Sequence, residues 1–334
     1  MTDSRPGPDG AASMQPNDSP AVSVIIPAYN VAPFLGEALE SVKNQRFSDY
    51  EVIVVDDGSP DDVASVCAPF LTDPRFSMVR IENSGLSGAR NHGISLARAP
   101  LVAMLDGDDR YRPAYLERMV AKLAAHPEAS FVTCDAISFG ALANAGERFS
   151  DRYPQDEPIT LERLLRREAT VFGLCTIRKE ALLAVGGYDQ SLRSSEDLDL
   201  WLRLLATGAT GQLVAEPLVD YRRHAASLSN NRARLMQTTA MVYQKAAEAL
   251  EGQPEARLAE ALRDEAQAIS RFEMGVDWVL AGNRRQGIRE MRASRHKAGN
   301  WKWTLALFVF SLVPLLAGPA VALYRQGNNN AKIS

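Results

Sequence analysis

Short runs of apolar, mostly β-branched residues alternate with amphipathic stretches from Val22 onward, and this alternation constrains the fold more than any other feature. The expected strands are the apolar runs 22–26, 51–55, 76–81, 101–105 and 131–134. Helices are expected between them, with Pro33 and Pro113 suited to first helical turns and apolar residues following at helical spacing. Strands that alternate with helices predict a doubly wound, mostly parallel α/β sheet.

Three polar clusters follow three of these expected strands directly. PAYN occupies positions 27–30, DDGS occupies 56–59 and DGDD occupies 106–109. In open α/β sheets, ligands bind beyond the carboxyl ends of the strands. The three clusters are therefore expected to meet at one edge of the sheet and to form one ligand site.

The last of these clusters contains three acids, Asp106, Asp108 and Asp109, within four residues. Like charges this close repel one another, and their oxygen atoms suit a hard divalent cation such as Mg²⁺ or Mn²⁺. An acidic turn that caps the next helix is the alternative, and the position at the ligand edge favours the metal. In the second cluster, Asp56 or Asp57 could accept a hydrogen bond from a nucleobase or a ribose, although Asp-Gly-Ser is also an ordinary turn.

A further acidic stretch, at 193–204, carries the pattern of a helix start. Ser194 or Ser195 is the expected N-cap, and Glu196 and Asp197 fall in the first turn. These acids either stabilise the helix dipole or provide a general base, and the pattern does not separate the two. The glycine-rich stretch 83–91 contributes a cation, Arg90, and is a weak signal when taken alone.

In their order along the chain, these motifs resemble those of the family 2 glycosyltransferases, which are inverting enzymes with the GT-A fold. The resemblance covers about residues 22–229 and rests on six segments: SVIIPAYNVAPFLGEALESVKNQ, VIVVDDGSPDD, NSGLSGARNHGI, LVAMLDGDD, GGYDQSLRSSEDLDLWLRL and YRRHAASLS. It implies metal-dependent transfer of a sugar from a nucleotide diphosphate sugar, most commonly a UDP-sugar, to an acceptor hydroxyl with inversion. The implied setting is the synthesis of cell-surface polysaccharide or glycolipid.

The resemblance also implies roles for individual side chains. The residues implied in donor binding are Pro27, Tyr29, Asp56, Asp57, Arg90 and Asp106. The implied ligands of a Mn²⁺ or Mg²⁺ ion are Asp108, Asp106 and His224. Asp197 is the implied catalytic base, with Glu196 beside it.

Two alternatives remain open, a nucleotidyltransferase of similar fold and a non-catalytic relative that binds nucleotide sugars. A nicotinamide oxidoreductase would need GxGxxG directly after the first strand, where PAYN stands instead. The net charge of −4 gives no overall basic field for nucleic acid. The three cysteines form no CxxC pair and are expected to be free thiols in a reducing compartment.

The remainder of the chain suggests four parts. Residues 1–20 are rich in Pro, Gly, Ser and Asp and lack the apolar run of a secretion signal, so a disordered leader and a cytoplasmic catalytic domain at 21–229 are expected. Sequence rich in Ala, Leu and Glu predicts a helical appendage over 230–300, with a turn at 252–254. The fourth part is an apolar tail at 301–334.

The tail contains 21 uncharged residues at 304–324, close to the length that spans a bilayer. Seven basic residues and one acid precede this run between 284 and 302, and Trp301 and Trp303 suit a membrane interface. Attachment to the cytoplasmic face of the membrane is therefore expected, either across the bilayer or within its interface, near a saccharide or lipid-linked acceptor. The alternative is a buried helix kinked by Pro314 and Pro319.

Overall fold

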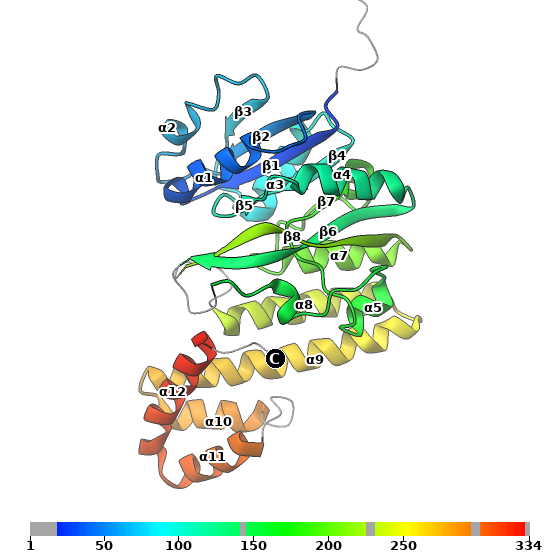
Figure 1. The fold of residues 1–334 in the computed structure, drawn as a ribbon. Helices are drawn as coiled ribbons and strands as arrows, with labels where there is room; N and C mark the ends of the chain where they lie inside the picture. The colour runs from blue at the N-terminus through cyan, green and yellow to red at the C-terminus, as the bar shows by residue number, and fades with distance from the viewer. Residues whose placement is uncertain (1–18, 141–144, 225–230, 295–300, 331–334) are drawn as a thin grey trace, which may run out of the picture.

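The computed structural model describes residues 19–140, 145–224, 231–294 and 301–330, and its central element is an eight-stranded mixed sheet (Figure 1). The strand order across the sheet is β3-β2-β1-β4-β7-β6-β8-β5. The strands are β1 (Val22–Ala28), β2 (Tyr50–Asp56), β3 (Phe76–Arg80), β4 (Leu101–Met104), β5 (Arg110–Tyr111), β6 (Ala129–Gly140), β7 (Thr176–Arg178) and β8 (Thr210–Arg223). β1 to β4 pair in parallel, whereas β7 runs antiparallel to both β4 and β6. The predicted mixed, mostly parallel sheet is confirmed.

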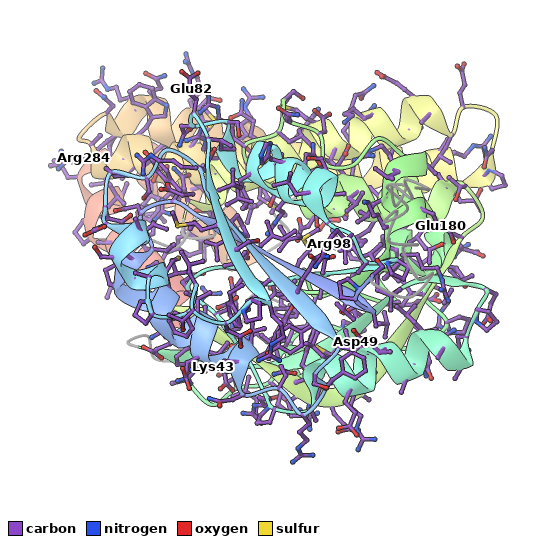
Figure 2. All side chains as sticks on the ribbon, turned by 90° about the horizontal axis from the view of Figure 1, so that it is seen from above. Lys43, Asp49, Glu82, Arg98, Glu180 and Arg284 are labelled. Atoms are coloured by element: carbon purple, nitrogen blue, oxygen red, sulfur yellow. The ribbon has the colours of Figure 1, made fainter. Side chains whose placement is uncertain are left out.

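Helices cover both faces of this sheet, as a doubly wound arrangement requires (Figure 2). They are α1 (Ala32–Lys43), α2 (Val63–Cys67), α3 (Gly85–Leu96), α4 (Tyr115–Ala125), α5 (Leu161–Leu165), α6 (Lys179–Ala184) and α7 (Glu196–Ala206). Val24 and Ile26 of β1 belong to the same core cluster as Leu35 of α1. Ile25, which points to the opposite face, belongs to a second cluster with Ile94 of α3. The apolar run of β1 is therefore explained by burial on both sides.

The carboxyl ends of β1, β2 and β4 lie next to one another. Ala28 pairs with Asp56, and the Asp57 amide donates to the Ala28 carbonyl at 3.0 Å. Gly107, just beyond β4, lies so close to β1 that a Cβ there would be 3.2 Å from the carbonyl oxygen of Pro27 and 2.9 Å from a methyl group of Val31. The three polar clusters thus meet at one edge, as the sequence predicts.

The chain continues beyond β8 as a group of helices, shown in the lower part of Figure 1. These are α8 (Arg232–Ala249), α9 (Pro254–Leu280), α10 (Arg284–Ser294), α11 (Trp301–Leu312), the short 3-10 helix η3 (Pro314–Leu316) and α12 (Ala317–Asn330). The expected turn lies between α8 and α9, where Gly252 has a φ of +86° and Pro254 begins α9. α8 contributes Val242 to the core that contains Leu200 of α7, so this helix packs against the sheet-bearing part of the chain.

The apolar run at 304–324 does not form one helix. α11 ends at Leu312, Pro314 begins η3 and α12 starts at Ala317. Part of the run packs on α9 and α10, since Leu307 and Val321 share a core cluster with Val276. Across the described ranges, no helix has the length and apolarity needed to cross a membrane. Residues 1–18 and the side chains of Trp301 and Trp303 lie outside what the structure describes.

Candidate active site

Arg90 of α3 joins acids from two other segments of the chain. Its Nη2 donates to Asp106 Oδ1 at 2.7 Å, and its Nη1 donates to Glu196 Oε1 at 2.8 Å. Its guanidinium also lies over the ring of Tyr188, 5.1 Å from the ring centre. Burial alone would lower the pKa of Arg90, but Asp106, Tyr188 and Glu196 outweigh burial and raise that pKa well above its usual value. A permanently charged, 4 % exposed Arg90 therefore fixes the end of β4 against the start of α7.

Asp108 and His224, two predicted metal ligands, contact each other although 116 residues separate them. His224 Nε2 lies 2.9 Å from Asp108 Oδ2, and the imidazole stacks on Phe34 with 5.1 Å between ring centres. Burial raises the pKa of Asp108, and the neighbouring Asp106 raises it further, while the contact with His224 opposes this rise. The structure therefore places this carboxylate where additional positive charge is favourable.

Asp109 is buried and has a structural partner. Its Oδ1 accepts from the Arg222 amide at 2.7 Å, and the Arg222 side chain donates from Nε to the Asp108 carbonyl, also at 2.7 Å. Burial raises the pKa of Asp109 well above its usual value, and Asp108 and Asp106 add to the effect. The end of β8 is thereby attached to the acidic turn, which sets the position of His224 two residues after Arg222. Arg222 is not among the site residues predicted from the sequence.

Asp197 lies in the first turn of α7 and is partly exposed. Its Oδ1 accepts from the Leu198 amide at 2.7 Å. Burial raises the pKa of Asp197, with a further rise from Asp106 and an opposing effect from Arg90. Burial likewise raises the pKa of Glu196 against the effect of Arg90. A carboxyl whose pKa is raised toward the working pH is the kind of group that acts as a general base.

The start of α7 is not capped in the way the sequence suggests. Ser195 is the N-cap residue, but it has a φ of +57° and its side chain makes no capping hydrogen bond. Its hydroxyl instead lies 2.9 Å from Thr239 Oγ1, and Ser194 Oγ lies 2.5 Å from Thr238 Oγ1. Both serines therefore bind α8, and the first turn of α7 is positioned by contacts with the helical region.

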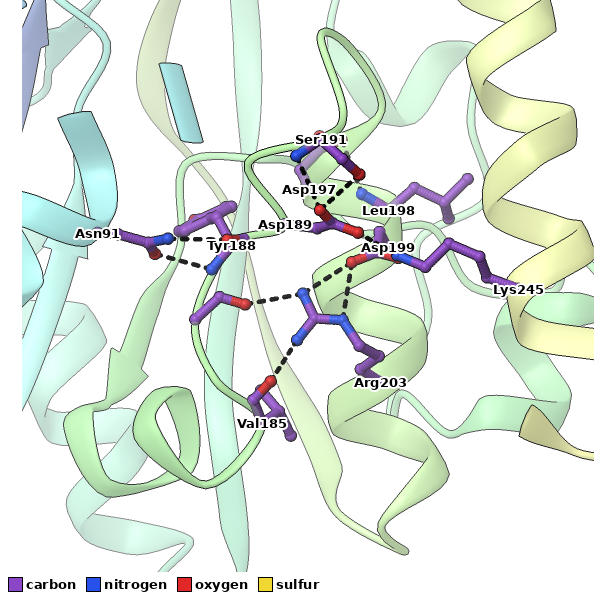
Figure 3. Close-up of polar contacts among 11 residues, drawn as sticks. Asn91, Val185, Tyr188, Asp189, Ser191, Asp197, Leu198, Asp199, Arg203 and Lys245 are labelled. Carbon is purple, nitrogen blue, oxygen red and sulfur yellow. Dashed lines mark hydrogen bonds and ion pairs between the residues drawn. The ribbon is translucent and has the colours of Figure 1, made fainter. Parts of the chain in front are cut away.

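A charged network shown in Figure 3 holds the rest of α7. Arg203 donates to Asp199 Oδ2 at 2.7 Å and to the carbonyls of Val185 and Gly187 at 2.6 and 2.7 Å. Lys245 of α8 donates to Asp199 Oδ1 at 2.6 Å and to Asp189 Oδ2 at 2.5 Å. The Asp199–Arg203 pair has the i,i+4 spacing of helix ion pairs and could have been found in the sequence. No spacing in the sequence links Lys245 to Asp199 or Asp189, so its role could not be predicted.

Asn91, the residue after Arg90, ties the loop before α7 to α3. Its side-chain nitrogen donates to the Tyr188 carbonyl at 2.8 Å, and its side-chain oxygen accepts from the Tyr188 amide, also at 2.8 Å (Figure 3). Tyr188 is the residue whose ring lies beneath the Arg90 guanidinium. Two consecutive residues of α3 thus fix the loop that leads to Asp197.

The predicted donor-binding residues of β1 and β2 differ in how far they are available to a ligand. Tyr29 is 51 % exposed just after β1, whereas Pro27 is buried within it. Asp56 is fully buried and accepts from the Ser59 amide at 2.8 Å and from Arg80 Nη1 at 2.5 Å. Tyr29 is therefore open to a base or sugar, while Asp56 could bind one only by exchanging these partners.

Asp57 has both carboxylate oxygens engaged at the start of α3. Oδ1 accepts from the Ser84 amide at 2.7 Å, and Oδ2 accepts from the Gly85 amide at 2.9 Å. These amides lack intrahelical partners, so Asp57 caps the helix that carries Arg90. Its predicted role in donor binding stays a prediction, and a donor would have to bind it alongside or in place of these partners.

The residues at this edge fit a divalent cation in part. Carboxylate oxygen and imidazole nitrogen are suitable donors for Mn²⁺, and Mg²⁺ commonly takes one or two carboxylates and fills its shell with water and phosphate oxygens. The Asp108–His224 contact supplies such a pair, and Asp106 adds to the local negative charge. Within the described ranges, no three His, Cys, Asp or Glu side chains are grouped closely enough to hold a metal by themselves. A cation here would thus need further ligands, such as a diphosphate.

The architecture matches solved structures across nearly the whole chain. Staphylococcus aureus TarS (residues 1–349), in a complex with UDP-GlcNAc, aligns with a TM-score of 0.61 and 18% identity over 92% of each chain. The mannosyltransferase PcManGT of Pyrobaculum calidifontis, in a complex with GDP-Man and Mn²⁺, aligns with a TM-score of 0.60 and 19% identity over 96% of this chain and 89% of that one. The fold and the acidic edge define a GT-A-type α/β protein.

The chain belongs to glycosyl transferase family 2, whose family model matches residues 23–183. TuaG of Bacillus subtilis is 29% identical over 69% of this chain and 89% of its own length. EpsE of the same organism is 30% identical over 62% of this chain and 74% of its own length. The succinoglycan biosynthesis protein ExoO of Rhizobium meliloti is 34% identical over 67% of this chain and 66% of its own, so this chain spans just under two thirds of ExoO.

Proposed function

We propose that this protein transfers a sugar from a nucleotide diphosphate sugar to an acceptor hydroxyl with inversion at the anomeric carbon. The observation that carries the proposal is the Arg90 junction, which holds Asp106 and Glu196 beside Asp197 at the carboxyl edge of the sheet. Asp197 combines a raised pKa with partial exposure in a rigidly held helix turn. These are the properties that a general base for an acceptor hydroxyl requires.

The chemistry assigned to the side chains is one proton transfer and one displacement. Ionised Asp197 accepts the proton of the acceptor hydroxyl as that oxygen forms a bond to the anomeric carbon. The bond from the anomeric carbon to the diphosphate oxygen breaks on the opposite face, and the nucleoside diphosphate leaves. Arg90 Nε is buried and has no hydrogen-bond partner among the described residues, so a diphosphate oxygen of the donor could satisfy it.

A divalent cation belongs to the same proposal, with Asp108 and His224 as its protein ligands and Asp106 in support. When bound, it supplies Lewis-acid stabilisation of the charge on the departing diphosphate. Asp109 keeps Asp108 in place through Arg222, and Asp57 supports Arg90 by capping α3. Pro27, Tyr29 and Asp56 complete the donor side in this proposal, with Tyr29 the most exposed of the three.

The relatives support a choice of donor and pathway. One structural neighbour holds UDP-GlcNAc and another holds GDP-Man with Mn²⁺, so a nucleotide sugar and a metal fit this fold, and we favour a UDP-sugar. TuaG is named for teichuronic acid biosynthesis and ExoO for succinoglycan biosynthesis. We accordingly propose a role in cell-surface polysaccharide or glycolipid synthesis, at the cytoplasmic face of the membrane, with a saccharide or lipid-linked acceptor.

The test is slow hydrolysis of a panel of nucleotide sugars in the presence of Mn²⁺ or Mg²⁺, which needs no knowledge of the acceptor. Metal-dependent release of a nucleoside diphosphate and a free sugar of inverted configuration is expected for one donor. If pyrophosphate is added and a nucleotide sugar is converted to a nucleoside triphosphate and a sugar 1-phosphate, the nucleotidyltransferase alternative is indicated. Donor binding without turnover, even when candidate acceptors are supplied, would indicate the non-catalytic alternative.

A further inference from the structure

The C-terminal helices expose an apolar surface that the fold does not cover. Six large apolar side chains of α11, η3 and α12 are each more than half exposed: Leu305, Phe308, Leu312, Leu315, Leu316 and Leu323. Others in the same elements, such as Leu307 and Phe310, face the small core formed with α9 and α10. These helices are thus apolar on both sides, whereas a surface helix of a water-facing protein has a polar outer side. Large apolar patches of this kind mark sites of protein or membrane contact.

α10 places exposed arginines next to this apolar surface. Ile288 and Met291 of α10 point into the small core, whereas Arg284, Arg285 and Arg289 are exposed. Arg284 lies at the periphery of the molecule in Figure 2. Neither Arg284 nor Arg285 forms an ion pair with any described residue. Arg284, Arg285, Pro314 and Leu315 line one cavity of about 440 Å³, so the cationic and apolar parts adjoin.

Exposed arginines beside an apolar surface could contact either a second copy of this chain or a membrane, and the charges distinguish the two. A two-fold contact centred on this surface would place two sets of these arginines in one interface, which like charges disfavour. The nearby acids Asp277 and Glu290 are already paired, with Arg325 and Arg271 respectively. An anionic bilayer instead offers phosphates to the arginines and acyl chains to the leucines, which is how interfacial helices bind.

We propose that the surface formed by these six apolar side chains with Arg284 and Arg285, here called the C-terminal surface, docks on an anionic phospholipid bilayer. In this arrangement α11, η3 and α12 lie within the interface and do not cross it. The break at Pro314 supports this geometry because it leaves helices of 12 and 14 residues in place of one long span. The docking does not depend on the chemistry assigned to Asp197.

The test is flotation of the full-length protein with vesicles of phosphatidylcholine alone or mixed with phosphatidylglycerol. Binding to the mixed vesicles is expected, with little binding to the neutral ones. Replacing both arginines (R284A with R285A) should lower the partition coefficient roughly 30-fold, because each basic residue near an anionic surface contributes about 1 kcal/mol. The matched control is R234A with R257A, which removes two exposed arginines of α8 and α9 and should leave the partition nearly unchanged.

A second variant and an alkaline extraction test the contact between the apolar side chains and the bilayer. L312D with L315D alters two side chains that are 69 and 70% exposed, so the fold should be retained while vesicle binding falls. Leu183→Asp, at a 58% exposed position of α6, is its control.

Alkaline carbonate should release the bound protein, whereas retention would show that the tail crosses the bilayer. Equal binding to both vesicle types, no effect of the arginine variant, or a dimer in solution that L312D with L315D dissociates would each overturn the proposal. Donor hydrolysis by the same samples reports the proposed chemistry separately.

Discussion

The acidic edge of the sheet and the α10 helix both carry arginines, but these arginines differ in burial and in ion pairing. At the acidic edge, Arg90 is 4 % exposed and bonded to Asp106 and Glu196, which come from different segments. On α10, Arg284 and Arg285 are exposed and form no ion pair within the described ranges. Buried, paired charges fix the positions of other groups, whereas exposed, unpaired charges remain free to bind a partner. The difference points to an internal reaction site and an external docking site in one chain.

The largest effect on stability is expected from Arg90→Met. This change leaves Asp106 and Glu196 without their buried partner, and the loss of one member of a buried ion pair costs about 3–5 kcal/mol. The free energy of unfolding, measured by urea denaturation, should fall by that amount. Arg166→Met is the control, because Arg166 and Glu162 form an ion pair in which both side chains are about half exposed, and its loss should cost less than about 1 kcal/mol. Equal losses in the two variants would remove the contrast between buried and exposed charge.

The pH dependence of turnover should reveal the raised pKa of Asp197. Only the ionised carboxylate can accept a proton, so the rate should fall as the pH falls through this pKa. Because burial and Asp106 raise the pKa, the acid limb of kcat should lie above the usual aspartate value of 3.8. Donor hydrolysis measured across the acidic range checks this, and a rate that stays flat down to the usual aspartate pKa would contradict it.

Lys245→Met tests whether α8 positions the reaction site from outside. The change removes charged hydrogen bonds to Asp199 and Asp189, for an expected loss of about 1–3 kcal/mol, at the lower end because Lys245 is partly exposed. A positioning role also predicts a lower kcat with an unchanged donor KM. Lys43→Met is the control: this exposed lysine of α1 has its ammonium 5.8 Å from the centre of the Phe70 ring, so its loss should cost less than about 1 kcal/mol and leave kcat unchanged. A stability loss with unchanged kcat would assign Lys245 a purely structural role.

The smallest effect is expected at Asp189. Burial would raise the pKa of Asp189, but Lys245 and Ser191 outweigh it and lower the pKa from 3.8 to about 2. A carboxyl with a depressed folded pKa adds stability above its unfolded pKa, and this contribution is lost as the pH falls from 3.8 toward 2. Asp189→Asn should therefore cost about 1 kcal/mol near neutral pH, allowing for partial exposure, and progressively less in that acidic window. A cost independent of pH would exclude the ion pair as its cause.

The parallel half of the sheet could be predicted because its strands are buried on both faces. β1 and β2 have no exposed residue, so both are mostly apolar in the sequence, and their inner polar residues, Ser23 and Glu51, hydrogen-bond each other. β8 is not among the expected strands, because its burial is mixed and its middle contains Glu216 and Pro217. β7 has only three residues, and its position between β4 and β6 follows from long-range pairing that a local pattern does not contain.

The sequence predicts where the site lies, but it does not predict which side chains contact one another there. Parallel strands bring their carboxyl ends together, which located the acidic clusters at one edge. The bonds from Arg90 to Glu196 and from Lys245 to Asp199 join residues 106 and 46 positions apart, and no periodicity links such positions. Asp57 shows the same limit, since its capping of α3 depends on the packing of β2 against that helix.

The most direct measurement of the central claim is donor hydrolysis and sugar transfer by Asp197→Asn. Loss of the general base should slow turnover by about 10²–10⁴-fold, while donor binding and the unfolding transition stay as in the unchanged protein. Glu180→Gln, at an exposed acid of α6, is the matched control and should keep full activity. Turnover by Asp197→Asn equal to that of the unchanged protein would contradict the assignment of the reaction to the acids around Arg90.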